Sequence, residues 1–325
     1  MREKESLRIV YMGTPEFAVL PLKALVENNY NVVGVVTMPD KPAGRGHRIQ
    51  ESAVKQYAKS VNLPILQPEK LKAEEFLDEL RTLKADLQIV VAFRMLPEVV
   101  WAMPELGTFN LHASLLPQYR GAAPINWAII NGEKETGVST FFLKHEIDTG
   151  AIILQEKTPI FPTDDVETVH DRLMEIGAKA VIDTVNLILK GEDEAIPQEK
   201  IELKEELKAA PKIFRPTCRI NWGQPAEKIW NFVRGLSPYP AAWSELYQEE
   251  KDKGLQFKVF KVSVTGKECS SEMPGTLKTD GKSFLLVASL DYWLSIEVAQ
   301  LPGKKRLKID DLLRGFSITD ENFLK

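Results

Sequence analysis

The stretch IVYMGTPEFAVLPLKAL, from Ile9 to Leu25, begins with a β-branched and aromatic run and continues, after Gly13 and Pro15, with a helical pattern. A strand that leads through a tight turn into a helix is typical of a parallel α/β sheet. Dinucleotide-binding sheets place G-x-G-x-x-G at this turn, whereas Gly13 is the only glycine here, so NAD binding is not indicated. The sequence contains no P-loop either.

The same alternation continues along the first two hundred residues. Helical patterns at Phe17–Glu27 and Ala73–Leu83 separate apolar runs, and Asp164 with Glu167 predicts the capping box of a long helix that Gly191 ends. The runs that we predict as strands are Leu7–Met12, Val32–Thr37, Leu87–Phe93, Thr108–Ala113, Val138–Leu143 and Ile152–Leu154. We therefore expect a Rossmann-like, mostly parallel sheet with right-handed crossovers.

The residue pattern changes after a charged segment, Gly191–Glu206, which we interpret as a linker. Beyond it, a helical pattern at Ala226–Arg234 precedes short alternating runs separated by turn residues. These runs are Phe257–Val264, Ser283–Ala288 and Trp293–Ala299, with a basic turn at Gly303–Lys308. The sequence therefore predicts a catalytic domain at 1–190, a linker at 191–206 and a smaller OB-like β-barrel domain at 207–325.

Composition and charge limit the class of protein. Apolar residues make up 44% and charged residues 27% of the 325 residues, and no apolar run approaches the length of a membrane span. The N-terminus lacks the pattern of a signal or transit peptide, and only two cysteines are present, so we expect a cytoplasmic protein. Residues 207–325 carry 19 Lys and Arg against 14 Asp and Glu, a net charge of +5, whereas the rest carries 23 against 32, a net charge of −9. This asymmetry is a weak sign of an anionic partner for the basic segment, but the charge alone favours the alternative of ordinary surface charge.

Candidate catalytic residues lie in NLHASLLPQYRG, from Asn110 to Gly121. Asn110 and His112 are two residues apart, which places both on one face at the end of a predicted strand. An amide and an imidazole together can polarise a carbonyl group and move a proton. Asp148, in Asp-Thr-Gly, is a candidate carboxylate that could orient His112 and favour its charged form. A structural histidine and a plain turn are the alternatives, and a single Asp-Thr-Gly in an α/β pattern argues against an aspartic protease.

The segment from Asn110 to Leu154 resembles the core of the folate-dependent formyltransferase family. Matches continue in IVYMGTPEFAVLPLKAL, in MPDKPAGRGHRI from Met38 to Ile49, in VVAFRMLP, and in the entry to a C-terminal domain from Ala210 to Trp243. Within that family, the Pro-Ala-Gly-Arg-Gly loop and the C-terminal domain are typical of the members that act on tRNA. The resemblance implies 10-formyltetrahydrofolate as donor and the α-amine of methionyl-initiator tRNA as acceptor, with no metal.

The resemblance also assigns roles to residues. Asn110 and His112 would stabilise the oxyanion, and Asp148 would orient His112. The residues that it places around the folate are Ser114, Leu115, Leu116, Pro117, Phe93, Arg94, Met95 and Leu96. Those that it places on the tRNA are Lys41, Arg45, His47 and Arg48. Separately, the charge cluster of Lys304, Lys305 and Arg306 suits contact with phosphates, although such a run of charges is more often a solvated turn. We expect a monomer that does not bind membranes.

Three other functions are compatible with parts of the pattern. A hydrolase domain of formyltetrahydrofolate dehydrogenase shares the core, but normally continues into further domains. A sugar-nucleotide formyltransferase shares the chemistry, but the Pro-Ala-Gly-Arg-Gly loop disfavours it. An RNA-binding protein without activity needs none of Asn110, His112 and Asp148. Incubation with formyl donor and each acceptor separates these alternatives.

Overall fold

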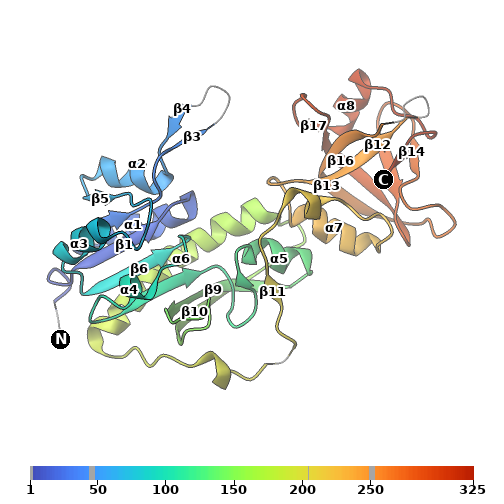
Figure 1. Ribbon diagram of the computed structural model, residues 1–325. Helices are drawn as coiled ribbons and strands as arrows, with labels where there is room; N and C mark the ends of the chain where they lie inside the picture. The colour runs from blue at the N-terminus through green and yellow to red at the C-terminus, as the bar shows by residue number, and fades with distance from the viewer. Residues whose placement is uncertain (1–2, 44–47, 204, 249–252) are drawn as a thin grey trace. The chain divides into compact units, whose positions relative to one another are not determined.

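The computed structural model describes residues 3–43, 48–203, 205–248 and 253–325. It contains two compact units (Figure 1). The first consists of residues 1–121, 135–159 and 170–209, and the second of residues 122–134, 160–169 and 210–325. Short segments from the middle of the chain therefore belong to the second unit. The predicted boundaries at 190 and 207 remain a prediction.

A seven-stranded sheet forms the centre of the first unit. From edge to edge its strands are β10 (Ile152–Pro159), β9 (Glu135–Phe142), β7 (Thr108–His112), β6 (Leu87–Val91), β1 (Ile9–Gly13), β2 (Val32–Val36) and β5 (Ile65–Leu66). Strands β5, β2, β1, β6 and β7 pair in parallel, whereas β9 and β10 pair antiparallel. The predicted mostly parallel sheet is thus confirmed. The strand order reverses direction between β1 and β6, which is where α/β sheets bind ligands.

Helices cover both faces of this sheet because successive strand residues point to opposite sides. Val10 and Met12 pack against α3 and α4 in one apolar cluster. On β7, Leu111 faces Gly177 of the long helix α6. The helices of this unit are η1 (Glu16–Ala18), α1 (Val19–Glu27), α2 (Ala53–Ser60), α3 (Glu74–Thr82), α4 (Glu98–Trp101), α6 (Val166–Lys190) and η2 (Gln198–Lys200). Two short strands, β3 (Lys41–Ala43) and β4 (Arg48–Gln50), pair antiparallel with each other as a separate two-stranded sheet.

The cap of α6 differs from the predicted one by one residue. Asp165 accepts a hydrogen bond from the Thr168 backbone N–H, and the Asp165 backbone N–H donates to the Thr168 hydroxyl. Asp164 instead accepts from the Phe161 backbone N–H. Asp164 and Asp165 both fit the sequence pattern of a helix cap, so the sequence alone did not distinguish between them. Gly191, with φ of +67°, ends the helix as predicted.

The second unit is an antiparallel sheet that closes almost into a barrel. Its strand order is β14 (Leu277–Thr279), β15 (Leu285–Ala288), β16 (Tyr292–Gln300), β13 (Leu255–Glu268), β12 (Ala242–Tyr247) and β18 (Phe323–Leu324), with β17 (Leu307–Lys308) beside β16. A bridge between Thr276 and Phe323 joins the two ends of this order. Its helices are α5 (Pro124–Ile130), η3 (Arg215–Cys218), α7 (Ala226–Arg234) and α8 (Ile309–Gly315). The predicted barrel domain is therefore confirmed.

Arg234 shows why residues 160–169 belong to this unit. Its guanidinium is almost buried, lies over the Trp230 ring and donates to the backbone carbonyls of Phe161 and Asp164. Burial lowers the pKa of Arg234, and the nearby Asp164 carboxylate opposes that shift. A buried guanidinium must be satisfied by hydrogen bonds, so these carbonyls fix the segment in place.

Candidate functional site

His112 occupies the carboxyl end of β7 and is 7% exposed. Its Nε2 lies 2.9 Å from the backbone carbonyl oxygen of Tyr119. A carbonyl oxygen only accepts hydrogen bonds, so Nε2 carries the proton. The other ring nitrogen, Nδ1, is then the one available for chemistry, either with a free lone pair or, in the charged ring, with a second proton.

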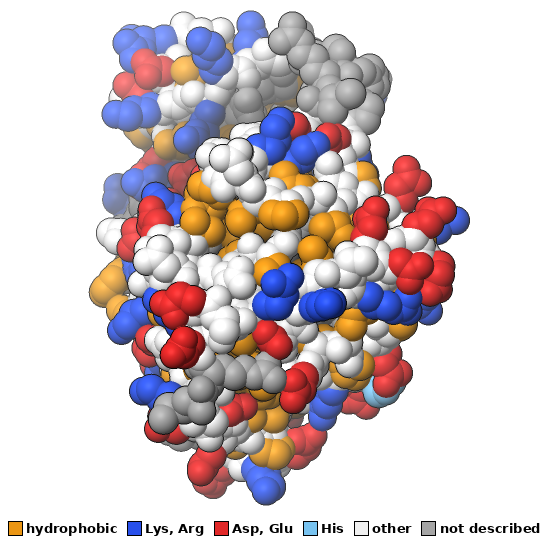
Figure 2. All heavy atoms as spheres, turned by 90° about the vertical axis from the view of Figure 1, so that its left-hand side faces the viewer, with side chains coloured by type: hydrophobic (Ala, Val, Ile, Leu, Met, Phe, Trp, Pro, Cys, Tyr) orange, Lys and Arg blue, Asp and Glu red, His pale blue; other side chains and the backbone are white. Residues whose placement is uncertain are grey.

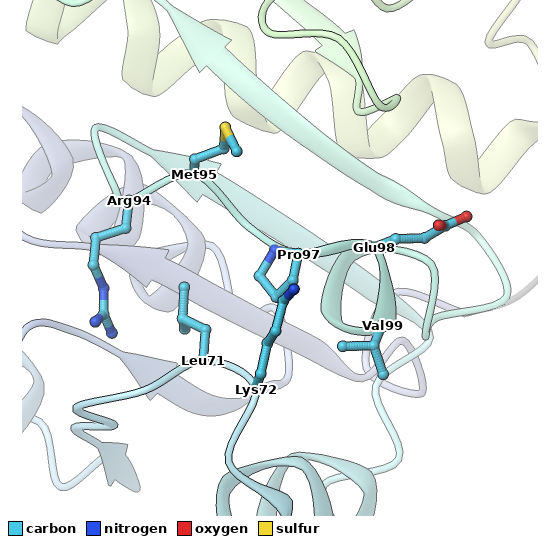
Figure 3. A pocket seen from close by; sticks show the side chains of 7 residues that line it. All are labelled: Leu71, Lys72, Arg94, Met95, Pro97, Glu98 and Val99. Carbon is cyan, nitrogen blue, oxygen red and sulfur yellow. The ribbon is translucent and has the colours of Figure 1, made fainter.

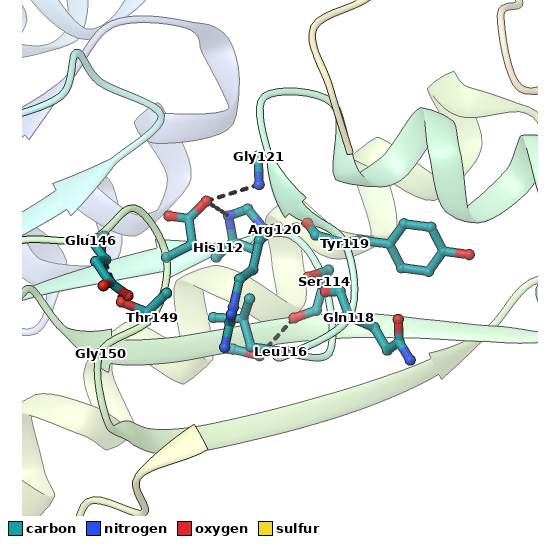
Figure 4. A network of polar contacts seen from close by, with 12 residues as sticks. His112, Ser114, Leu116, Gln118, Tyr119, Arg120, Gly121, Glu146, Thr149 and Gly150 are labelled. Atoms are coloured by element: carbon teal, nitrogen blue, oxygen red, sulfur yellow. Dashed lines mark hydrogen bonds and ion pairs between the residues drawn. The ribbon is translucent and has the colours of Figure 1, made fainter. Parts of the chain in front are cut away.

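Asp148 faces this free nitrogen. Its Oδ2 lies 3.9 Å from His112 Nδ1 and accepts a hydrogen bond of 3.0 Å from the backbone N–H of Gly121 (Figure 4). The structure therefore brings together two residues that are 36 positions apart in the sequence. A carboxylate in this position stabilises a positive charge on the imidazole ring.

Asn110 lies two residues before His112 in β7 and is partly exposed. Side chains alternate between the two faces along a strand. Asn110 and His112 therefore lie on the same face of β7, as predicted, and Leu111 lies on the other face. Among the described residues, no hydrogen bond involves the Asn110 side chain. Its amide N–H groups are thus available to an external acceptor.

The loop from Ser114 to Arg120 is held by polar contacts within the loop and with Ser139 of β9. Ser114 Oγ donates to the Gln118 carbonyl at 2.7 Å, and Ser139 Oγ donates to the Ser114 carbonyl at 2.6 Å. The Leu116 backbone N–H donates to Ser139 Oγ. Of the four residues predicted here to contact folate, Ser114, Leu116 and Pro117 are buried and Leu115 is partly exposed. Their placement indicates that this loop shapes the site mainly through its backbone.

The four residues predicted on the other side of the folate, Phe93–Leu96, lie in two different environments. Leu96 is buried in an apolar cluster, and Phe93 packs against the same cluster. Arg94 and Met95 instead line a hollow of about 550 Å³ (Figure 3). The remaining lining residues are Leu71, Lys72, Pro97, Glu98 and Val99. Asn110, His112 and Asp148 do not line this hollow, so it is distinct from the residues proposed for chemistry.

Arg94 is anchored within the first unit. Its guanidinium donates to the backbone carbonyls of Pro68 and Glu69, and burial lowers its pKa. Lys72 has no ion pair among the described residues, and its amino group extends beside Pro97 (Figure 3). The hollow thus combines apolar side chains with two cationic groups, Lys72 and Arg94, and one carboxylate, Glu98, so cations are in excess and an amphipathic anion is the ligand class that it suits.

The residues predicted to bind tRNA lie apart from this chemistry in the sequence and are only partly described. Lys41 is exposed at the start of the β3–β4 hairpin, and Arg48 begins β4. Arg45 and His47 lie outside the described residues. Lys304, Lys305 and Arg306 are all exposed in the turn between β16 and β17, and the Arg306 guanidinium lies 5.1 Å from the Phe260 ring centre.

Sequence reasoning did not identify every residue that shapes the site. Tyr119 and Gly121 act through backbone atoms, which leave no side-chain signature. Gln198 is 3% exposed and donates to the carbonyls of Asp148 and Gly150. It lies in the segment that we interpreted as a linker, and no motif there marks it.

Comparison with known proteins defines the class. The formyl transferase profile matches residues 7–185, and the profile for the formyl transferase C-terminal domain matches residues 212–317. The chain therefore belongs to the formyl transferase family.

Among its relatives are methionyl-tRNA formyltransferases from Bacteroides fragilis, 63% identical over 98% of both chains, and from Parabacteroides distasonis, 64% identical over 97% of both. The fold is similar to that of Aquifex aeolicus HypX in complex with tetrahydrofolic acid, with a TM-score of 0.62, 18% identity, and coverage of 94% of this chain and 47% of that one. It is also similar to an N-formyltransferase from Helicobacter canadensis, with a TM-score of 0.61, 19% identity, and coverage of 89% and 98%. At these identities the solved structures show the fold alone.

No group of His, Cys, Asp or Glu side chains within the described ranges is arranged to hold a metal ion. Across those same ranges, no helix is long and apolar enough to cross a membrane.

Proposed function

We propose that this protein transfers the formyl group of 10-formyltetrahydrofolate to the α-amine of methionyl-initiator tRNA. The observation that carries the proposal is the similarity to methionyl-tRNA formyltransferases at 63% identity over 98% of the chain, which includes both units. The grouping of Asn110, His112 and Asp148 supports it, because these are the residues that the chemistry requires. The same proposal places the protein in the cytoplasm as a monomer.

The reaction joins the amine nitrogen to the formyl carbon and moves the carbonyl electron pair onto oxygen. Asn110 would donate an amide N–H to this developing oxyanion, because no other described residue uses that donor. His112 with a free Nδ1 lone pair would accept the proton that the attacking nitrogen loses. The same proton would then pass to the nitrogen of the donor as its bond to the formyl carbon breaks.

Asp148 would stabilise the imidazolium formed in that step. Its Oδ2 is 3.9 Å from Nδ1, close enough for a direct charge interaction in a partly desolvated site. The Gly121 N–H bond prevents the carboxylate from turning away. Protonation of His112 is thus balanced locally, and the site needs no metal for this step.

The hollow beside Arg94 and Met95 fits part of the folate. Its volume of about 550 Å³ is within the range of small-molecule sites. Lys72 would attract the carboxylates of the folate glutamate, while Leu71 and Pro97 offer apolar contact. We propose this hollow as an extension of the donor site.

RNA contact would rest on local clusters of cations. Acidic and basic side chains are interspersed on the face seen in Figure 2, with hydrophobic side chains gathered near its centre. A face of mixed charge provides no broad attraction for phosphates. In the second unit, however, Lys308 and Lys261 both pair with Val298 from neighbouring strands, so these two exposed lysines lie in one row of the sheet, where Lys261 also forms an ion pair with Glu297. The turn with Lys304, Lys305 and Arg306 adjoins that row.

The experiment that tests the proposal compares acceptors. The protein is incubated with 10-formyltetrahydrofolate and, separately, methionyl-initiator tRNA, an amino-sugar nucleotide or water alone. Formylation of the tRNA alone supports the proposal. Formylation of the sugar, or release of free formate at a comparable rate, would favour the alternative enzymes, and no reaction would favour a binding protein.

A further inference from the structure

The turn that carries Asp148 is unfavourable by itself. Asp148 has φ of +55°, in the left-handed region that residues with a Cβ atom rarely adopt. The backbone at Gly150 is also tightly packed, because a Cβ atom there would lie 1.6 Å from the Phe142 carbonyl oxygen. Within the turn, the Thr149 hydroxyl donates to the Glu146 carbonyl. Such a conformation persists only when surrounding contacts determine it.

Gln198 supplies those contacts from a distant part of the chain. Its Nε2 donates one hydrogen bond to the Asp148 carbonyl at 2.9 Å and another to the Gly150 carbonyl at 2.8 Å. Both N–H groups of the amide are therefore used, and both hold the turn. The side chain is 3% exposed, so water cannot easily replace these bonds.

The carbonyl end of the same amide binds Arg120. Oε1 accepts from Arg120 Nε at 3.1 Å and from Nη2 at 2.6 Å. Figure 4 shows the Arg120 side chain extending from the loop that contains Tyr119 and Gly121. That loop provides the Tyr119 carbonyl for His112 and the Gly121 N–H for Asp148. One buried amide thus connects the two loops that fix the His112–Asp148 pair.

Gln198 is itself held in place. Ile196, two residues earlier, forms a bridge with Ile152 through hydrogen bonds of 2.9 and 2.8 Å. Ile201 packs against the cluster of Leu116, Phe141 and Ile152. The segment around Gln198 is therefore anchored to the first unit on both sides and can act as a rigid support.

We infer that Gln198 is a positioning residue, which holds the Asp148 turn so that the carboxylate faces His112 Nδ1. The inference rests on the proposed formyl transfer. It predicts that loss of the two N–H donors lets the turn relax, and a displacement of about 1 Å can lower a rate about 10²-fold. Gln198 does not touch the reacting atoms, so its effect must depend on Asp148.

Two substitutions separate its contacts. Gln198→Met keeps the length of the side chain and removes every hydrogen bond. Gln198→Glu keeps an acceptor for Arg120 and removes the two donors to the turn. We expect both variants to lower kcat by about 10- to 100-fold while the KM values for folate and tRNA change little. Gln88→Met is the matched control, since Gln88 is a fully buried glutamine at the amino end of β6, where it pairs with Thr108, whereas His112 lies at the carboxyl end of β7.

Rates are measured per folded protein, with thermal unfolding as the check, and repeated in an Asp148→Asn background. There, Gln198→Met should cause no further loss of kcat. The inference is overturned if Gln198→Glu retains wild-type kcat, if Gln198→Met is equally harmful without the Asp148 carboxylate, or if Gln88→Met loses as much activity. Wild-type protein that does not formylate methionyl-tRNA would instead contradict the proposed function.

Discussion

The residues proposed for chemistry and those proposed for RNA contact are held in opposite ways. His112 and Asp148 are largely buried, and each has a hydrogen bond to a backbone group of another segment. Lys304, Lys305 and Arg306 are exposed, and no ion pair fixes them among the described residues. The difference indicates that the catalytic group is preorganised, whereas the cations adjust to the partner when it arrives. Substitutions should therefore lower catalytic rate in the first group and affinity in the second.

The largest expected effect is on catalysis. His112→Ala and Asp148→Ala should each lower the formylation rate at saturating substrates by about 10²–10⁴-fold, the usual contribution of a group that takes part in general acid–base catalysis. Single-turnover formylation of methionyl-tRNA measures this decrease in rate. Melting temperatures should remain close to that of the wild type. Near-normal turnover in both variants would disprove the proposed roles.

The next effect concerns salt dependence. Replacement of Lys304, Lys305 and Arg306 by alanine should weaken tRNA binding and reduce the slope of log affinity against log salt by about 2–3, since each lost phosphate contact removes roughly one released counterion. Titrations of tRNA at several salt concentrations give the slope. An unchanged slope would show that these cations do not contact phosphate.

Arg45 tests acceptor recognition more narrowly. We expect Arg45→Ala to lower kcat/KM for tRNA about tenfold, or about 1.4 kcal/mol, while the KM for folate stays unchanged, because a guanidinium can stack on a base and bind phosphate. Steady-state kinetics with each substrate varied in turn measure both values. Weakened folate binding with intact tRNA kinetics would instead assign this loop to the donor pocket.

The smallest effect concerns a fixed carboxylate in the second unit. Asp280 accepts hydrogen bonds from the Ser283 hydroxyl and from the backbone N–H groups of Ser283 and Lys282, which hold its pKa well below the usual value. A lowered folded-state pKa stabilises the protein above the unfolded pKa, about 3.9, and this contribution is lost as the pH falls below it.

Asp280→Ala should therefore reduce the melting temperature slightly at pH 7, and the difference from wild type should shrink below about pH 4. Thermal unfolding across this range provides the measurement. Glu321→Ala, an exposed carboxylate in the same unit, is the control. A difference that does not depend on pH would mean that the Asp280 charge contributes nothing.

Local patterns predicted most of the architecture. The predicted strand at Leu87–Phe93 ends at Val91, and the predicted helix at Ala226–Arg234 has those same bounds. Such elements follow from periodicity within a few residues. The predicted capping residue of α6 was wrong by one position. Asp164 and Asp165 can both cap a helix, and only the path of the folded chain selects Asp165.

The segment from Gly191 to Glu206 was the least informative part of the sequence. Its charge and Pro197 favoured a linker, yet Ile196 bridges to Ile152 and Gln198 is buried against the turn of Asp148. A single buried glutamine has no periodicity and no motif, so nothing in the local sequence distinguishes it from a solvated one.

The sequence by itself determined the class of fold, the family and the types of residue available for chemistry. These follow from short-range periodicity and from motifs whose members lie close together in the chain. Only the tertiary structure decided that His112 Nε2 is occupied by the Tyr119 carbonyl, which leaves Nδ1 facing Asp148. It also decided that Gln198 connects the two loops. Hydrogen bonds between segments dozens of residues apart depend on the folded path, which local propensities do not encode.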